Sequence, residues 1–393
     1  MKFAAWIVAA VVMIWATAQP AGRSEPWTVI ISGDTFGYLS PCGCVKPMSG
    51  GIRRRVAAIH SLKGTSNNLI LDTGGLVKDT SRQSEMKAET LAQAMSYATV
   101  DAVHLSEADQ QLGPAMTDAV ERLSKAKLIT TTQVFHKGPF TVLGADTEAE
   151  ARELMSGISR DKTIPVLLYA GSREEARKLA EEFPSLQLIV YRTASNPPSE
   201  EEVIGKTWLV SPGEKGKNVL RLTWNGVKFE QYEVKHLGPD VHDDPKASQA
   251  FQTYLNRVKD EQLFEQLPRK EGKDFAGNQL CISCHQEEGE IWHKSRHGKA
   301  LATLEKENQD RDPDCVSCHV VGSDFTTGYM SRKVTPNLTD VGCESCHGPG
   351  KAHAMAPKKY EMGKVGAASC MPCHNPNHSP GFDFEKYWPK IAH

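Results

Sequence analysis

The chain has 393 residues, with 46 lysines and arginines against 48 aspartates and glutamates, so its net charge near pH 7 is close to zero. This balance argues against nucleic acid as a partner, and it leaves a peripheral association with a membrane open. The length and the 39% of hydrophobic residues allow two or three domains with ordinary cores.

Residues 1–18 are typical of a secretory signal peptide. Lys2 precedes an unbroken apolar run from position 3 to position 16, and Ala16-Thr17-Ala18 fits the small-x-small pattern of a cleavage site. The run is shorter than the roughly 20 residues that cross a bilayer, which favours cleavage over retention as a membrane anchor. We therefore expect a protein that is exported to the periplasm or to the cell exterior.

Residues 27–235 alternate between strand-like and helix-like segments. Runs of β-branched residues predict strands, and amphipathic runs predict helices, the first of which carries arginines on its polar face. We expect strands at 28–31, 68–72, 102–105, 166–169, 186–191, 207–210 and 219–224, and helices at 51–62, 85–97 and 173–183. Such alternation predicts an α/β layered sandwich.

The order of the segments ISGDTFGYLSPCGC, LILDTGGL, AVHLSEADQQLG and WLVSPGEKGKNVLRLTW resembles the N-terminal domain of 5′-nucleotidase-like metallophosphoesterases. The resemblance implies two metal ions, held by an Asp-x-His, a second aspartate, an Asn-His pair and later histidines. Of these ligands the sequence keeps only the first, Asp34. The other positions carry Phe36, Gly75, Glu107, Ala108, a residue near Ala170, and Thr193 or Ser195.

Two-metal phosphoryl transfer needs protein ligands on both ions, and one carboxylate cannot provide them. We therefore expect the metallophosphoesterase-like fold without the activity, in a docking or scaffolding role. A single-metal site formed by Asp34, Glu107 and Asp109 is a further alternative.

Residues 236–274 are rich in charged residues and glutamine and contain an amphipathic run at 245–267. This pattern predicts a helical linker with a solvated charged face. The linker leads to a last domain at 275–393.

Residues 275–393 contain four Cys-x-x-Cys-His motifs. Two thiols three positions apart can bond the two vinyl groups of one porphyrin, and the adjacent histidine then lies under the iron. A zinc half-site or a redox dithiol is the alternative for one such motif, but four copies in an exported chain favour four covalently bound haem c groups. The attachment residues are Cys281, Cys284, His285, Cys315, Cys318, His319, Cys343, Cys346, His347, Cys370, Cys373 and His374. The segment has few long apolar runs and can bury few aliphatic side chains, so the porphyrins would form its core. We therefore expect a mainly α, haem-packed multihaem cytochrome c domain.

The strings "WxxSxH", "VGCESCHGPGxxH" and "FDFEKYWPKIAH" around these motifs resemble the tetrahaem cytochrome c-554 family. The resemblance implies a second axial histidine on three irons, at the positions of His297, His353 and His393, and one iron without a protein ligand on its far side. His378 and His293 are the alternatives for that fourth position. If neither fills it, the iron can bind a small molecule such as nitric oxide.

Cys42 and Cys44 are left over, since Val45 stands where a proximal histidine would be. In an oxidising compartment a loop-fixing disulfide is the default state of two neighbouring thiols. A strained, redox-active disulfide that exchanges electrons with the haems, or a thiolate site for a soft metal, are the alternatives.

These features predict an exported tetrahaem electron carrier with redox protein partners, in which no residue is assigned a catalytic role. The alternatives are an oxidoreductase acting at an open haem or at the Cys42/Cys44 pair, and a metallophosphoesterase with a haem appendage. The sequence indicates neither the electron donor and acceptor nor the oligomeric state.

Overall fold

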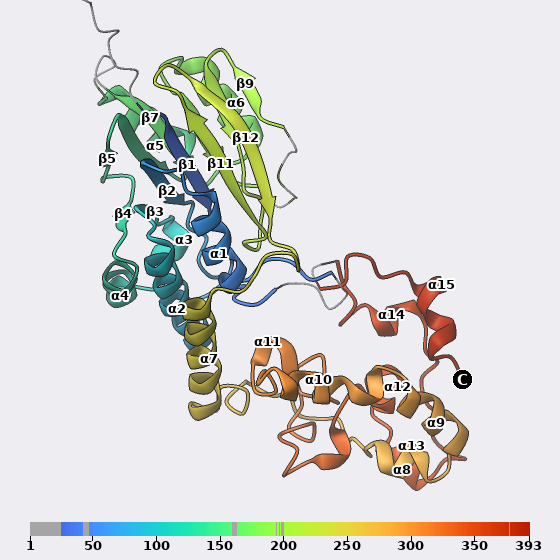
Figure 1. The fold of residues 1–393 in the computed structure, drawn as a ribbon. Helices are drawn as coiled ribbons and strands as arrows, with labels where there is room; N and C mark the ends of the chain where they lie inside the picture. Colours follow the sequence, from blue (N-terminus) through green and yellow to red (C-terminus); the bar gives the residue numbers. More distant parts are fainter. Residues whose placement is uncertain are drawn as a thin grey trace, which may run out of the picture.

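The structure is a computed structural model that describes residues 25–41, 47–158, 163–193, 195, 197, 200–376 and 378–393. The predicted signal peptide, Cys42 and Cys44 lie outside the described residues. Figure 1 shows a sandwich of two sheets with helices on its outer faces, and a region of short helices beside it. None of the helices in the described part of the chain combines the length and the apolar character needed to cross a membrane.

The first sheet has a parallel centre and an antiparallel edge. Its order is β12 (Phe229–His236), β11 (Asn218–Trp224), β1 (Trp27–Ser32), β2 (Asn67–Asp72), β3 (Ala102–His104) and β4 (Lys127–Ile129). Strands β1 to β4 run parallel to one another, whereas β11 pairs antiparallel with both β1 and β12. The register of β1 and β2 pairs Ser32 with Asp72, so both strands end at the same edge of the sheet.

The second sheet repeats this design. Its order is β5 (Phe135–Lys137), β6 (Phe140–Ala145), β7 (Ile164–Tyr169), β8 (Leu188–Tyr191), β10 (Thr207–Val210) and β9 (Glu202–Ile204). The four inner strands are parallel, and the short strands β5 and β9 pair antiparallel at the two edges.

Three cores separate the layers of the sandwich. Alternation along β1 sends Val29 and Ile31 into the core between the two sheets, whereas Ile30 faces the helices α1 (Ile52–Leu62), α2 (Arg82–Ala98), α4 (Pro114–Ser124) and α7 (Pro245–Asp260). The outer face of the second sheet packs on α5 (Glu148–Ser156) and α6 (Arg173–Glu182). The result is an α/β/β/α arrangement, which confirms the predicted α/β layered sandwich.

Helix α2 of the sandwich reaches the C-terminal region through its side chains. The Ser81 hydroxyl accepts the Ser84 N–H at its start, and Thr99 ends it in the left-handed conformation with a φ of 57°. Helix α7, from the predicted linker, packs against α1 and α2 and buries Phe251, Tyr254 and Leu255 in the same core. The C-terminal part of the chain therefore starts from a helix that belongs to the core of the sandwich.

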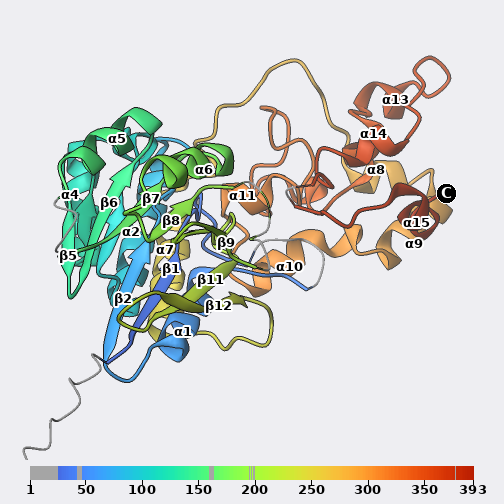
Figure 2. The ribbon, with the colours of Figure 1, turned by 90° about the horizontal axis from the view of Figure 1, so that it is seen from above.

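The C-terminal region is mainly helical, and its helices are short. They are α8 (Asn278–Ile282), α9 (Gln286–Lys294), α10 (Ala300–Lys306), α11 (Pro313–Val316), α12 (Cys343–His347), α13 (Lys351–Met355), α14 (Ala367–Cys370) and α15 (Phe384–Tyr387). A small cluster of buried apolar residues around Phe264, Leu301 and Val316 forms its core. Figures 1 and 2 both place this region to one side of the sandwich.

Candidate functional site

Each of the four Cys-x-x-Cys-His motifs starts on a short helix, namely α8, α11, α12 or α14. The backbone then turns so that the N–H of His285 bonds to the carbonyl of Cys281 at 3.0 Å, and the N–H of His374 bonds to that of Cys370 at 2.9 Å. In a helical turn, residues three and four apart lie on the same side, so both sulfurs and the imidazole face one ligand. Seven of the eight motif cysteines are half-buried, and Cys284 is exposed.

The rings of three motif histidines each lie opposite a second histidine. The centroids of His285 and His353 are 6.3 Å apart, those of His297 and His374 are 6.1 Å apart, and those of His347 and His393 are 5.8 Å apart. Two metal–nitrogen bonds of about 2 Å, with about 1.1 Å from each nitrogen to its ring centre, add up to about 6.2 Å. Each pair of rings is therefore spaced to hold one metal ion between them.

Backbone carbonyls orient several of these rings through Nδ1. The Nδ1–H of His353 donates to the Tyr360 carbonyl at 2.6 Å, that of His347 to Gly363 at 3.2 Å, and that of His393 to Ile391 at 2.9 Å. A carbonyl only accepts, so a neutral ring in this position carries its proton on Nδ1 and keeps the lone pair of Nε2. This is the tautomer that an iron ligand needs, and such hydrogen bonds commonly orient metal-binding histidines.

His319, in the second motif, is arranged differently. Its Nδ1–H donates to the Ala300 carbonyl at 2.8 Å, so its Nε2 is also available to an iron. Among the described residues, however, no second histidine ring lies against it. His293 packs on Trp292 at 4.7 Å, and His378 lies close enough to Lys78, Lys215 and Asp314 to interact with their charges. The structure thus brings neither of the two alternative ligands into ring contact with His319.

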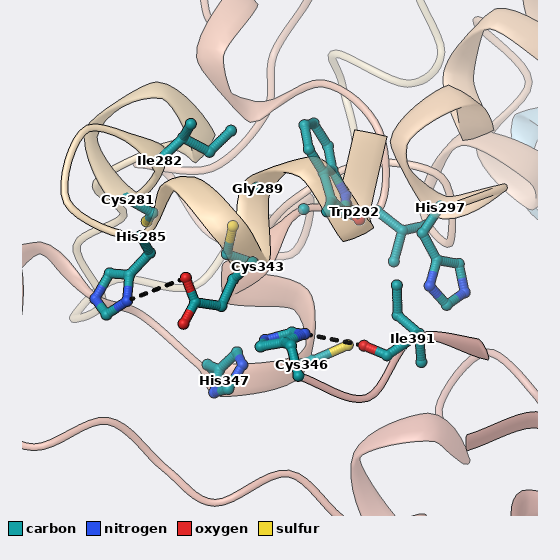
Figure 3. Close-up of a pocket in the computed structure, with 14 residues that line it drawn as sticks. Cys281, Ile282, His285, Gly289, Trp292, His297, Cys343, Cys346, His347 and Ile391 are labelled. Carbon is teal, nitrogen blue, oxygen red and sulfur yellow. Dashed lines mark hydrogen bonds and ion pairs between the residues drawn. The ribbon is translucent and has the colours of Figure 1, made fainter. Parts of the chain in front are cut away.

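The first and third motifs share a cavity (Figure 3). Cysteines and histidines of both motifs line it together with His297 and His393, and Trp292 and Ile391 supply apolar walls. Trp292 is fixed there because its Nε1–H donates to the Val341 carbonyl at 2.8 Å. An apolar wall with a few oriented nitrogen ligands is the environment that a porphyrin requires.

Glu344 holds the first and third motifs together. This buried carboxylate, between the two cysteines of the third motif, accepts the N–H groups of Ala276, Gly277 and Gly350 at 2.8, 2.8 and 2.6 Å. The glutamate of the CESCH string was available as a signal, but the sequence alone gives no reason to prefer it to a surface residue.

The edge of the first sheet carries the residues at which the resemblance to metallophosphoesterases implied a two-metal site. Asp34 is buried, and its Oδ1 accepts the Nε–H of Arg192 at 2.7 Å. Burial raises the pKa of Asp34 to about 7, although the ion pair with Arg192 opposes this effect. The guanidinium of Arg192 also lies 5.6 Å from the ring of Phe36, which occupies the histidine position of the Asp-x-His motif. Arg192 therefore places a protein cation beside the one carboxylate that the resemblance implied as a metal ligand.

Neighbouring carboxylates are also occupied by protein groups. Asp109 accepts the N–H groups of Gly75 and Leu76 at 2.9 and 2.7 Å, and Asp72 pairs with Arg55 at 3.3 Å. Arg55 is buried, so the prediction that the arginines of the first helix lie on a polar face is wrong for this residue. The described residues hold no group of three or more histidine, cysteine, aspartate or glutamate side chains placed to bind a metal ion.

Comparison with known proteins connects these two regions to two families. Residues 280–348, which contain the first three motifs, match the family described as cytochrome c554 and c-prime. Over 92 residues the chain is 39% identical to cytochrome c-554 of Nitrosomonas europaea, which corresponds to 20% of this chain and 39% of that protein. The C-terminal region is related to cytochrome c-554.

This relationship implies covalently bound haem c in the cytochrome c-554-like region. The match covers less than two thirds of the relative, so it does not extend to the activity of the whole chain. The fourth motif and the histidines at 353 and 393 lie outside residues 280–348, the part of the chain that matches this family. The haem attachment residues and the axial ligands remain predictions. The spacings of the histidine rings agree with the predicted axial ligands.

The sandwich resembles 5′-nucleotidases in fold. A putative 5′-nucleotidase from Staphylococcus aureus gives a TM-score of 0.52 at 14% identity, over 80% of this chain and 72% of that one. A 5′-nucleotidase precursor from Thermus thermophilus gives 0.50 at 17% identity, over 80% and 74%. Identities this low establish the fold alone, and they confirm the predicted metallophosphoesterase-like sandwich.

Proposed function

We propose that the protein is an exported tetrahaem c-type cytochrome that carries electrons between redox protein partners. The observation that carries this proposal is the set of three histidine pairs, spaced by 5.8 to 6.3 Å. When bound, each haem supplies a one-electron couple between ferric and ferrous iron. The protein contributes the attachment thiols, the axial nitrogens and the hydrogen bonds that orient them.

In this proposal the pairs assign the ligands haem by haem. His353 faces the first motif at His285, His393 faces the third at His347, and His297 faces the fourth at His374. Two histidines hold an iron with little rearrangement between its oxidation states, which suits a carrier. The shared cavity of the first and third motifs supports close spacing of two haems.

The sandwich serves, in this proposal, as a docking or scaffolding domain without phosphoesterase activity. Supporting evidence comes from Arg192, whose positive charge lies beside Asp34 where the related fold would need a cation. The hydrogen bonds of Asp109 to two backbone N–H groups further reduce its capacity as a ligand. Export rests on the predicted signal peptide at residues 1–18, and the partners would meet the haem edges in weak, transient encounters.

A second candidate function follows from His319. If its iron has no ligand on the far side, a small molecule such as nitric oxide can bind there, and the other three haems can deliver electrons to it. This candidate makes the protein an oxidoreductase with the same cofactors.

Electron paramagnetic resonance of the oxidised, haem-loaded protein tests both functions, after mass spectrometry has counted the covalent haems. We expect four haems, of which three are low-spin and one is high-spin, and a nitric oxide adduct at one iron after reduction. Fewer than four haems would overturn the tetrahaem proposal. Four low-spin signals without an adduct would remove the oxidoreductase and leave the carrier. Hydrolysis of a nucleotide monophosphate with added Mn²⁺ would contradict the inactive sandwich.

A further inference from the structure

The sandwich reaches into the haem-binding region at the turn before the second motif. Gln83 and Lys87 lie four residues apart on α2 and so share one face of the helix. Gln83 donates from Nε2 to Asp312 at 2.8 Å, and the hydroxyl of Tyr254 on α7 donates to the other oxygen of Asp312 at 3.2 Å. Asp312 is buried and caps α11, the helix that carries Cys315. The second motif is therefore positioned by the other domain.

Lys87 adds a charge to this contact. Its ammonium group pairs with the carboxylate of Asp314, the residue directly before Cys315. The lysine side chain is only 9% exposed, whereas that of Asp314 is 59% exposed. Burial alone would lower the pKa of Lys87, but the carboxylates of Asp314 and Asp312 hold it above its usual value. Lys87 is thus a charged, largely buried cation.

This cation lies beside the thiol that would attach a haem. The charge of Lys87 is near enough to Cys315 for the two groups to interact, and Cys315 is one of the predicted thioether residues. Cys318 and His319 complete the same motif within a single turn. Charge and burial near a haem are among the factors by which a protein adjusts its reduction potential.

We propose that Lys87, supplied by the 5′-nucleotidase-like domain, raises the reduction potential of the haem attached at Cys315 and Cys318, and that Asp314 lowers it. The inference rests on the proposed tetrahaem function. It gives the sandwich a role beyond docking: the domain controls the electron affinity of one haem through a residue of its own helix α2.

The sign follows from the charge of the iron. Reduction from ferric to ferrous removes one positive charge, so a nearby cation favours the reduced state and a nearby carboxylate favours the oxidised state. A unit charge about 10 Å away, at an effective dielectric constant of about 20, changes such an equilibrium by on the order of tenfold. For a one-electron couple a tenfold change corresponds to about 59 mV.

The test is a spectroscopic redox titration of three haem-loaded variants, Lys87→Met, Asp314→Asn and the double variant. The predicted high-spin signal of the haem at His319 separates it from the other three haems. We expect Lys87→Met to lower its potential and Asp314→Asn to raise it, each by on the order of 59 mV. The double variant should differ from the wild type by less than either single variant, because both charges are removed together.

Two controls keep the result specific. Lys87→Arg retains the charge and should retain the potential, and Lys206→Met makes the same chemical change at an exposed lysine between β9 and β10. Shifts of the same sign in both single variants, or unchanged potentials in a protein with four haems, would overturn this inference alone. Absence of covalent haem at Cys315 and Cys318 would overturn the proposed function together with it.

Discussion

Asp34→Asn should remove a pH-dependent loss of stability from the sandwich. Burial raises the pKa of Asp34 from 3.8 to about 7, so between these values the folded state keeps a proton that the unfolded state has released. The free energy of unfolding therefore falls as the pH rises through this window. At about 1.4 kcal/mol for each pH unit, the total is about 4 kcal/mol, of which about 3 kcal/mol lies between pH 5 and pH 8. Asparagine cannot ionise and should not show this loss.

Urea unfolding of the haem-loaded protein, followed by far-ultraviolet circular dichroism at pH 5, 6, 7 and 8, measures this effect. The quantity of interest is the difference between Asp34→Asn and wild type, because other titrating groups contribute equally to both proteins. We expect this difference to grow by about 3 kcal/mol in favour of the variant as the pH rises. Asp118→Asn, at an exposed position of α4, should run parallel to the wild type.

The opposite outcome has a definite meaning for the site. If Asp34→Asn and wild type keep a constant difference from pH 5 to pH 8, Asp34 is already ionised in the folded protein at pH 5. The reasoning from burial would then be refuted, and Arg192 would stabilise a permanent carboxylate. A retained metal ligand is ionised in that way, so the absence of a pH effect would argue for renewed tests of cation binding.

Three further changes test other parts of the structure. His353→Ala should convert the haem of the first motif to high spin, so that two of the four irons are high-spin. His378→Ala should leave the number of high-spin irons unchanged. A changed number in the His378 variant would make His378 a ligand. Asp312→Ala should cost about 1–3 kcal/mol in urea unfolding, because the buried hydroxyl of Tyr254 and the half-buried amide of Gln83 lose their acceptor, and an unchanged midpoint would show that the interdomain contact is weak. Leu301→Ala, at a position with no exposed surface, should destabilise the cytochrome c-554-like region by about 2–5 kcal/mol, and a loss below 1 kcal/mol would contradict its place in the core.

The sequence predicted the inner strands of the sandwich except β6, and it missed the strands at the edges of both sheets. The strand predicted at 207–210 is β10, and the helix at 51–62 differs from α1 by one residue. Buried parallel strands are recognised because they are continuous apolar runs. The missed strands include β4, β5 and β9, each of three residues, in which exposed or half-exposed positions interrupt the apolar pattern. Strands this short obtain their conformation from neighbouring strands and leave little local signal.

In the haem-binding region the sequence predicted the haem attachment residues, because covalent attachment requires the local pattern Cys-x-x-Cys-His. Pairing of the histidines depends on tertiary structure: His297 and His374 are 77 positions apart in the sequence, yet their rings are 6.1 Å apart. The same limit applies to Arg192 and Lys87. Each is an ordinary charged residue in the sequence, and its importance comes from a partner supplied by a distant segment, Asp34 or Asp314.

The position of α7 has a practical consequence for dissecting the protein. A fragment that stopped at residue 235 would lack Phe251, Tyr254, Leu255 and Val258, which cover the apolar faces of α1 and α2. The exposed surface would favour aggregation, and the truncated sandwich would also lack the tyrosine that holds Asp312. Separate expression of the two halves should therefore keep residues up to at least 263 with the sandwich, since Leu263 is the last residue of its core.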